Sequence, residues 1–134
     1  MLDSEAVQAL VDVHHRKHRR ALAAIEVATP RPRTGADPPH VVVPTSVRVE
    51  AGWNRRAPGA APANRTRVED HPLGSDVADR AAVLRGDLRI SVADAHLATV
   101  LATGRAPFAV LTSDVEDIRR IAAHLDAAVT VVAL

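Results

Sequence analysis

The spacing of hydrophobic residues changes several times along the chain, and each change marks the boundary of a predicted element. Apolar positions with helical spacing run through four stretches, and a further short helix is expected from Thr45 onwards. The four stretches are residues 4–28, 75–86, 91–104 and 113–127. Short runs rich in β-branched residues, which are typical of buried strands, occur at 40–44, 108–112 and 129–134.

The order of these elements predicts the fold class. In the last third of the chain, helix and strand alternate, which implies parallel pairing of strands through right-handed crossovers. A length of 134 residues is that of one ordinary domain. We therefore expect a single α/β domain with a mainly parallel central sheet flanked by helices.

Several predicted helices have recognisable end residues. A serine before a helix can accept a hydrogen bond from a free backbone N–H, and a glycine after it allows the chain to turn away. The candidates are Ser75, Gly86, Ser91 and Gly104, together with Ser113 and Glu116 as a capping box.

Segments outside the regular pattern predict turns and loops. The block "HHRKHRR" (14–20) is either an exposed stretch of one long helix or the junction of two helices. Residues 29–39 and 54–67 are rich in proline and glycine. The first is predicted to be a loop, and the second a mobile loop or a poorly ordered turn. "HPL" (71–73) is a candidate for a very short strand.

Composition excludes several classes of protein. The absence of cysteine excludes disulfides, zinc–thiolate sites and cysteine nucleophiles. Aromatic residues make up only 1% of the chain, so recognition of bases by stacking is not expected. The net charge of +1, with Lys17 as the only lysine, gives no strong electrostatic preference for nucleic acid. Without an apolar membrane-spanning stretch or a signal-peptide pattern, a soluble cytoplasmic protein is expected.

Four carboxylates occur where a parallel sheet would bring them together, because ligands bind at the carboxyl ends of the strands of such sheets. Asp114 directly follows a predicted strand, and Glu50 lies in the helix after another strand. Asp94 is in the first turn of a helix, and Asp3 precedes the first helix. Grouped carboxylates repel one another unless a divalent cation neutralises them, and oxygen ligands suit Mg²⁺ or Mn²⁺.

Helix capping is the other interpretation of these acids. Capping boxes fit the sequence at 113–116 and at 91–94. Carboxylates in a first helical turn also interact favourably with the helix dipole, by about 0.3–1 kcal/mol. Capping accounts partly for Asp94, but less well for Asp114 and for Glu50 within an otherwise apolar helix.

Four segments extend over almost the whole chain in a recognisable order. They are "LDSEAV" (2–7), "VVVPTSVRVE" (41–50), "SVADAHLAT" (91–99) and "AVLTSDVEDIRRIAA" (109–123). In this order and at these distances they resemble a PIN domain, and more narrowly the VapC toxins of bacterial toxin–antitoxin pairs. "ADAH" and "VLTSDVEDI" are the most specific parts. The resemblance implies a single PIN-like domain over residues 1–134.

The resemblance implies a metal-dependent endoribonuclease, the toxin of a type II toxin–antitoxin system. It places the catalytic acids at Asp3, Glu50, Asp94 and Asp114, of which Asp3, Asp94 and Asp114 bind Mg²⁺ or Mn²⁺. Such a metal lowers the pKa of bound water and stabilises charge on phosphoryl oxygens, so hydrolysis needs no protein nucleophile. The implied partners are an RNA substrate, a second copy of the chain and a cognate antitoxin that covers the acidic site.

Other residues match supporting positions of the family. Ser4 and Ser113 match small hydroxyl positions that help to hold the site, and Asp117 matches a commonly acidic position. His96, close to the "DA" acid, is expected to be structural. For contact with RNA phosphates, the candidates are Arg16 and Arg19 in the basic block and Arg55 and Arg56 in the loop, where a solvated surface is the alternative.

The N-terminus departs from the family pattern. Family members usually have a central strand before the first acid, whereas only Met1 and Leu2 precede Asp3. Either the first strand is nearly absent or, as we expect, the true start lies upstream. The alternative function is a degenerate PIN domain that binds RNA or a protein without cleavage. A receiver domain is disfavoured, because it would need a lysine near the last strand and none follows Lys17.

Overall fold

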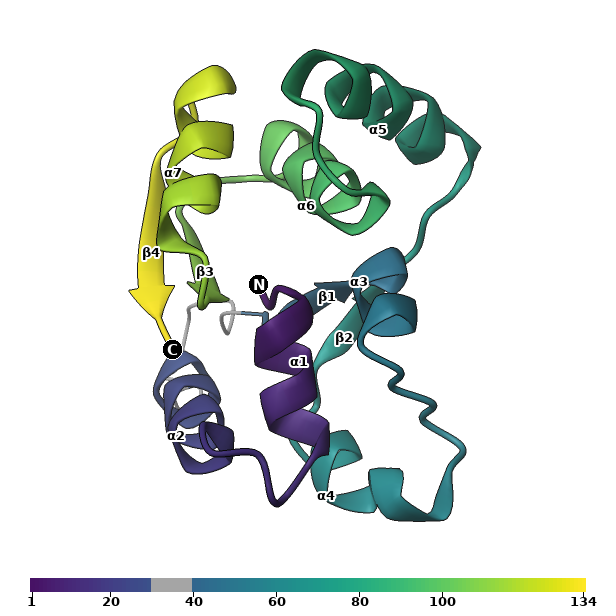
Figure 1. The fold of residues 1–134 in the computed structure, drawn as a ribbon, viewed down its shortest axis with the longest axis vertical. Helices are drawn as coiled ribbons and strands as arrows, with labels where there is room; N and C mark the ends of the chain where they lie inside the picture. Colours follow the sequence, from purple (N-terminus) through teal and green to yellow (C-terminus); the bar gives the residue numbers. More distant parts are fainter. Residues whose placement is uncertain (30–39) are drawn as a thin grey trace, which may run out of the picture.

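The computed structural model describes residues 1–29 and 40–134, and most of the loop predicted at 29–39 lies outside these ranges. The fold is α/β, as the sequence predicts (Figure 1). The α-helices are α1 (Ser4–Val11), α2 (His18–Ala28), α3 (Thr45–Glu50), α4 (Ala61–Asn64), α5 (Ser75–Leu88), α6 (Val92–Thr103) and α7 (Val115–His124). The strands are β1 (Val42–Pro44), β2 (Glu69–His71), β3 (Phe108–Thr112) and β4 (Val129–Ala133).

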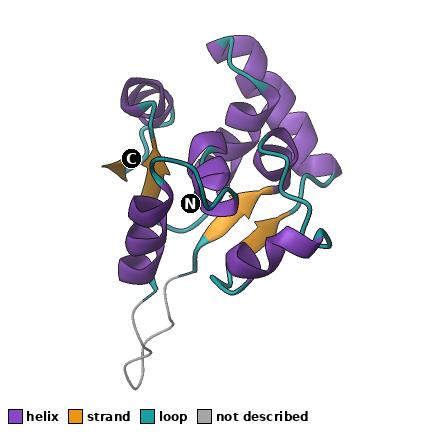
Figure 2. Cartoon of the chain, turned by 60° about the horizontal axis from the view of Figure 1, so that its bottom comes forward, coloured by secondary structure: helices purple, strands orange, loops and turns teal. Residues whose placement is uncertain are grey.

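The strands form two parallel pairs in place of the single central sheet that was predicted. β1 pairs with β2, with Val42 opposite Glu69, and β3 pairs with β4, with Phe108 opposite Val129. Figure 2 shows the β1–β2 pair among the helices and the other pair set apart from it. The prediction of parallel pairing is confirmed, whereas the sheet is divided.

Backbone hydrogen bonds from the first three residues link the two pairs of strands. The N–H of Leu2 donates to the carbonyl of Val42 at 3.1 Å, and the N–H of Asp3 donates to that of Leu111 at 3.2 Å. The N–H of Leu111 in turn donates to the carbonyl of Met1 at 2.9 Å. Leu2 and Leu111 form an isolated parallel bridge. α1 begins immediately after Asp3, and this segment forms an isolated bridge rather than a regular strand between the two pairs.

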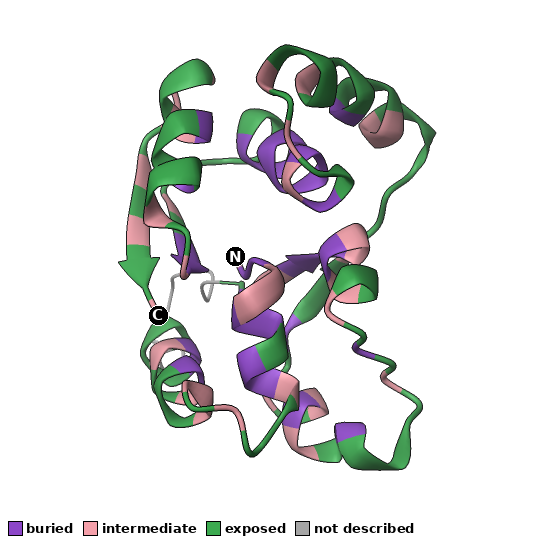
Figure 3. Cartoon of the chain, in the orientation of Figure 1, coloured by how far each residue is buried: buried purple, intermediate pink, exposed green. Residues whose placement is uncertain are grey.

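The core consists of two apolar clusters, the first mainly from the N-terminal half of the chain and the second mainly from the C-terminal half. The first includes Leu2, Val7, Leu10, Val43 and Trp53, and the second includes Leu97, Leu101, Val110, Ile118 and Ile121. Figure 3 shows buried residues concentrated on α1, α6 and β1. α5 packs against α6 but buries only Ala81, so it forms an outer layer. None of the described helices combines the length and apolar character that a membrane span requires.

The predicted helix ends are confirmed for α6, and for the start of α3 at Thr45, whereas they are wrong for α5 and α7. α6 follows Ser91 and ends before Gly104, as expected. The cap of α5 is Gly74, and this helix continues through Gly86 to a left-handed Arg89 with φ of 53°. A left-handed residue ends the helix there, so Gly86 has no terminating role.

Three other segments differ from or refine the sequence interpretation. The block "HHRKHRR" is the junction of α1 and α2 rather than part of one long helix. The 54–67 segment contains α4 and a 3₁₀ helix (Pro58–Ala60), and Ala60 and Ala63 are buried, so the prediction of a mobile loop is wrong. The short strand β2 begins earlier than the predicted 71–73.

Candidate functional site

Asp3 lies where the N-terminus of α1 meets the end of β3. It is the N-cap of α1, and its Oδ1 accepts a hydrogen bond from the N–H of Ala6 at 2.7 Å. The residue is only 9% exposed, and burial raises the pKa of its carboxyl group. The hydroxyl of Thr112 and the backbone N–H groups of Ala6 and Ser113 oppose this rise, because they stabilise the charged form. Asp3 is therefore a largely buried carboxylate held by neutral donors.

Glu5, in the same first turn of α1, carries the next carboxylate. Its Oε1 lies 2.5 Å from the Nζ of Lys17, which also donates to the hydroxyl of Ser113 at 2.6 Å. The hydrogen bond from Lys17 is the main cause of the lowered pKa of Glu5. The charge of Glu5 contributes to the raised pKa of Asp3, so the two carboxylates interact electrostatically. Sequence reasoning missed this group, although a single lysine in an arginine-rich chain was a signal.

Glu50 joins this region from α3. The hydroxyl of Ser4 donates a hydrogen bond to its Oε2, which connects the last residue of α3 to the first residue of α1. Glu50 is exposed, and Ser4 is half-buried. The predicted supporting residue Ser4, which follows Asp3 in the sequence, is thus in contact with the predicted acid Glu50.

Asp114 is the N-cap of α7, and this corrects the capping box predicted at Ser113 and Glu116. The Oδ1 of Asp114 accepts a hydrogen bond from the N–H of Asp117 at 3.1 Å. Its own N–H donates to the hydroxyl of Thr112 at 2.8 Å. Capping therefore explains Asp114 better than the sequence suggested, because Ser113 faces Lys17 instead. Thr112 contacts both Asp114 and the predicted first acid, so these two acids share a neighbour.

Asp94 lies in the first turn of α6 and forms the capping box that the sequence predicts. The hydroxyl of Ser91 donates to its Oδ2 at 2.7 Å, and the N–H of Asp94 donates to that hydroxyl at 3.0 Å. In residues 1–29 and 40–134, Asp94 does not form a group of three or more His, Asp or Glu side chains with the other predicted acids. α6 packs against α3 and β1, which places it in the half of the fold that contains Glu50.

The structure brings together only part of the predicted acidic set. The hydroxyl of Thr112 contacts the carboxylate of Asp3 and the backbone N–H of Asp114, while the carboxylate of Asp114 caps α7. Glu50 contacts Ser4, and Asp94 contacts Ser91. Across the described ranges, no group of three or more His, Asp or Glu side chains is arranged to hold a metal ion. The oxygen donors present are nevertheless those that Mg²⁺ prefers, and Asp3 has no ion-pair partner among the described residues.

Asp117 and the predicted RNA-contacting arginines differ in their surroundings. Asp117 pairs with Arg120 at 3.0 Å, and both side chains are about half exposed. Its backbone N–H donates to Oδ1 of Asp114, whereas its carboxylate pairs with Arg120 and not with a residue of the predicted site. Arg16, Arg19 and Arg56 are exposed. Such side chains are available to an anionic partner.

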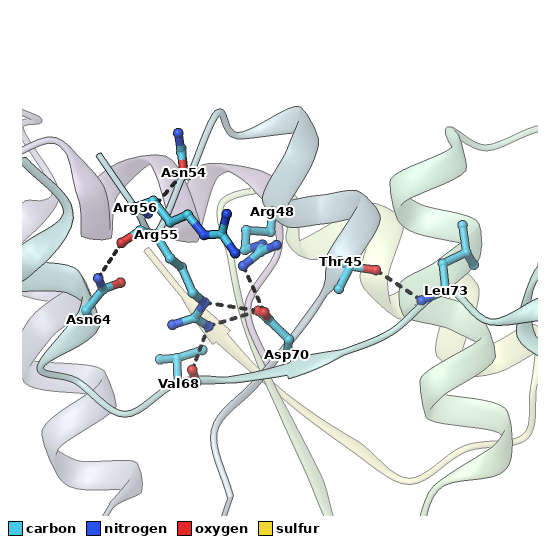
Figure 4. A network of polar contacts seen from close by, with 9 residues as sticks. All are labelled: Thr45, Arg48, Asn54, Arg55, Arg56, Asn64, Val68, Asp70 and Leu73. Carbon is cyan, nitrogen blue, oxygen red and sulfur yellow. Dashed lines mark hydrogen bonds and ion pairs between the residues drawn. The ribbon is translucent and has the colours of Figure 1, made fainter. Parts of the chain in front are cut away.

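Arg55 has structural contacts instead (Figure 4). Its Nη2 donates to the carbonyl of Val68 at 2.7 Å and to Asp70 at 2.9 Å, and its guanidinium lies 4.1 Å from the centre of the Trp53 ring. Arg48 donates to the other oxygen of Asp70 at 2.8 Å. Arg55 therefore holds the segment after α3 against β2, and its prediction as an RNA contact has less support than that of its exposed neighbour Arg56.

His96 belongs to a polar network with Ser46 and His71, of which the sequence indicated only His96. His96 is fully buried, and its Nδ1 lies 2.9 Å from the hydroxyl of Ser46. Its Nε2 lies 3.4 Å from Nδ1 of His71. Burial lowers the pKa of His96 to about 4, and the charge of His71 acts in the same direction. The structural role expected of His96 agrees with this position, whereas its two partners gave no signal in the sequence.

Comparison of the chain with protein-family models, with curated proteins and with solved structures gives no match. The assignment of a family and a function therefore depends on the sequence motifs and on the geometry described above.

Proposed function

We propose that this chain is a PIN-like, metal-dependent endoribonuclease that acts as the toxin of a type II toxin–antitoxin system. The observation that carries the proposal is the position of Asp3. A largely buried carboxylate without an ion-pair partner in the described structure lies at the end of β3, beside Thr112, which also contacts Asp114. Burying an uncompensated charge is unfavourable, and a divalent cation would remove that cost.

The fold supports the same proposal. Met1–Asp3 forms hydrogen bonds to both β1 and β3, which is the central place that the first strand takes in a PIN-like layer. In the proposal the two pairs of strands, which are separate two-stranded sheets in this structure, are the two halves of such a layer, with β2 and β4 at its edges. Glu50 lies at the end of the helix that follows β1, and Asp114 lies two residues after β3. Both acids therefore come after the carboxyl end of a strand, where ligands usually bind in parallel sheets.

In this proposal Asp3, Asp94 and Asp114 hold Mg²⁺ or Mn²⁺, and Glu50 is the fourth acid. The metal would supply a Lewis acid for the attacking water and for the RNA phosphate. Ser4 fixes Glu50, and Thr112 with Ser113 fixes Asp3.

The cap of α6 is the hydrogen bond from the backbone N–H of Asp94 to Ser91, and it does not involve the carboxylate. Metal binding by Asp94 therefore competes only with the hydrogen bond that its Oδ2 accepts from the exposed Ser91. Exposed Arg16, Arg19 and Arg56 are the candidates for contact with RNA. The homodimer, the antitoxin and the cytoplasmic location are part of the proposal and rest on the sequence motifs.

The test is cleavage of RNA by the purified chain with Mg²⁺ or Mn²⁺. Cleavage should stop with a chelator, and Asp94→Asn and Asp114→Asn should each lower it by at least about 100-fold, since even outer-shell changes at metal sites cost 10–100-fold. Asparagine also caps helices well, so Asp114→Asn leaves the start of α7 intact. Glu116→Gln, an exposed acid next to Asp117, is the matched control and should retain activity. Equal cleavage by the wild type and Asp94→Asn would refute the proposal.

A second candidate function is a degenerate PIN domain that binds RNA or a protein without cleavage. The separation of Asp94 from the other acids favours it. RNA binding that is measured by fluorescence anisotropy, requires no metal and is unchanged in Asp94→Asn would support this candidate over the nuclease.

A further inference from the structure

Three arginine side chains lie around the single carboxylate of Asp70. Arg48 in α3 donates from Nη1 to Oδ2 of Asp70 at 2.8 Å. Arg55 donates to Oδ1 of Asp70 from Nε at 3.3 Å and from Nη2 at 2.9 Å. The side chain of Arg56 extends over the same region towards Arg48 (Figure 4). This arginine cluster (Arg48, Arg55 and Arg56) therefore has more positive charge than the one carboxylate neutralises.

Protein contacts hold two guanidinium groups of the arginine cluster in place. That of Arg55 lies 4.1 Å from the centre of the Trp53 ring, and its Nη2 also donates to the carbonyl of Val68 at 2.7 Å. The side chains of Arg48 and Arg55 are each 25% exposed, so both still reach the surface. Nε of Arg48 has no hydrogen-bond partner among the described residues. Asp70 thus leaves part of the donor capacity of the cluster unused.

Arg56 is the member of the cluster that is open to solvent. It is exposed, and the ion pairs of the described residues do not include its guanidinium group. Its backbone is fixed, because its N–H donates to Oδ1 of Asn54 at 3.0 Å and the preceding carbonyl, that of Arg55, accepts from Asn64 at 2.9 Å. An anion can therefore bind Arg56 without first displacing a carboxylate of the described structure.

A phosphate of a nucleic-acid backbone is the anion that this surface fits best. Guanidinium groups bind phosphate oxygens through paired, charge-assisted hydrogen bonds. Exposed Arg65 and Arg67 add positive charge later in the same segment, and a series of cations matches a polymer with one charge in each repeat. Trp53 is buried under Arg55 and so offers no ring for base stacking. The expected contact is therefore with the backbone and not with the bases.

We propose that the arginine cluster is a phosphate-binding subsite for RNA. Arg48 and Arg56 contact a backbone phosphate, while Asp70 holds Arg48 and Arg55 in position. The inference rests on the RNA-binding part of the proposed function and requires no metal ion. The subsite belongs to the β1–β2 half of the fold, since Asp70 lies in β2 and Arg48 lies in the helix that directly follows β1.

The test is binding of a short fluorescein-labelled, single-stranded RNA of mixed sequence, measured by fluorescence anisotropy in EDTA at several salt concentrations. In Arg56→Gln, the Kd should rise about fivefold at about 0.1 M salt, and the slope of log affinity against log salt should become shallower by about 0.7, the contribution of one phosphate contact with a single strand. Arg85→Gln, which removes the same charge from an exposed position in α5, should keep the Kd and the slope of the wild type.

Asp70→Asn changes the charge of the cluster in the opposite direction. Loss of the carboxylate leaves the three guanidinium groups without their counter-charge, so RNA should bind about two- to fivefold more tightly. A cluster that served only the fold would bind RNA equally or more weakly after this change. Arg56→Gln decides the matter where Asp70→Asn does not fold, because the Arg56 side chain has no ion pair to lose in the described structure. Circular dichroism establishes that each compared variant is folded.

The possible results distinguish this inference from the proposed nuclease. RNA binding in EDTA that depends on Arg56, by a chain that does not cleave RNA when Mg²⁺ is added, would support the subsite and overturn the nuclease. Cleavage by the wild type, combined with an unchanged Kd and salt slope in Arg56→Gln, would overturn only the subsite. An equal loss of affinity in Arg85→Gln would also overturn it. Poly-glutamate that competes as well as unlabelled RNA of equal charge would assign the cluster to an acidic protein instead.

Discussion

Asp3 serves the helix and the candidate site with the same carboxylate. As N-cap of α1 it accepts a hydrogen bond from Ala6, and as a buried acid it has a raised pKa. A raised pKa means that the folded state disfavours the charged form, so at neutral pH the charge of Asp3 lowers stability. The capping hydrogen bond has the opposite effect. Two substitutions can separate these contributions.

Asp3→Asn should leave the free energy of unfolding at pH 7 equal to or above that of the wild type, because asparagine also caps helices and carries no charge. Asp3→Ala should lower it by about 1 kcal/mol, the usual cost of a lost cap. Urea unfolding of the metal-free proteins measures both values. A loss in Asp3→Asn as large as that in Asp3→Ala would show that the charge itself holds the N-terminus of α1.

Some contacts among the candidate residues agree with the sequence, whereas others could not be predicted from it. The contact between Ser4 and Glu50 joins two predicted residues, and Asp94 caps with Ser91 as expected. The prediction of Ser113 as the cap of α7 is wrong, because Asp114 caps this helix. The hydroxyl of Ser113 accepts a hydrogen bond from Lys17 instead, and a contact between residues so far apart in the chain leaves no local pattern in the sequence.

At the scale of elements, α5 contains a glycine that its helix does not need. Gly86 lies within α5, and a Cβ placed there meets no atom within 4 Å. Glycine in a helix interior costs about 0.5–1 kcal/mol relative to alanine, mainly through the entropy of the unfolded chain. This position therefore lowers the stability of the outer helix without a packing reason.

Gly86→Ala should raise the free energy of unfolding by about 0.5–1 kcal/mol. Gly52→Ala is the contrasting control, because Gly52 has a φ of 71° that alanine adopts only with strain, and it should lower stability. Thermal or urea unfolding of both variants checks the prediction. A decrease in Gly86→Ala would contradict the prediction.

The helix ends that could be predicted are those set by residues of the same helix. α6 was correctly bounded because Ser91 and Gly104 act on their own helix. α5 was not, because a left-handed arginine rather than a glycine ends it. The division of the sheet was also missed, since it depends on how Leu2 bridges to Leu111, and the local pattern contains no information on that pairing.

Across the whole molecule, the network of Ser46, His71 and His96 connects α3, β2 and α6. The pKa of His96 is lowered to about 4 in the folded state, from an ordinary value of 6.5. Between these two values the unfolded chain binds more protons than the folded chain, so stability rises with pH in this window. The contribution of neutral His96 to the free energy of unfolding is thus fully present above pH 6.5 and is lost as the pH falls towards 4.

The free energy of unfolding should therefore decrease by about 3 kcal/mol as the pH falls from 6.5 to 4, beyond the contribution of other groups. Urea unfolding in the presence of a chelator, at several pH values, measures this slope. His96→Gln should show a shallower slope, whereas His14→Gln, at an exposed position, should retain that of the wild type. Parallel slopes in the wild type and His96→Gln would contradict the assignment to His96.

The link between Met1–Asp3 and β3 also sets the order in which the protein can assemble during translation. Asp3 emerges from the ribosome early, but its backbone partner Leu111 and its neighbour Thr112 are made near the end of synthesis. Contacts between such distant residues cannot form until both have been synthesised. A nascent chain therefore carries its first acids in the right order yet cannot arrange them, and a ribosome that stalls before residue 112 releases no chain with the complete candidate site.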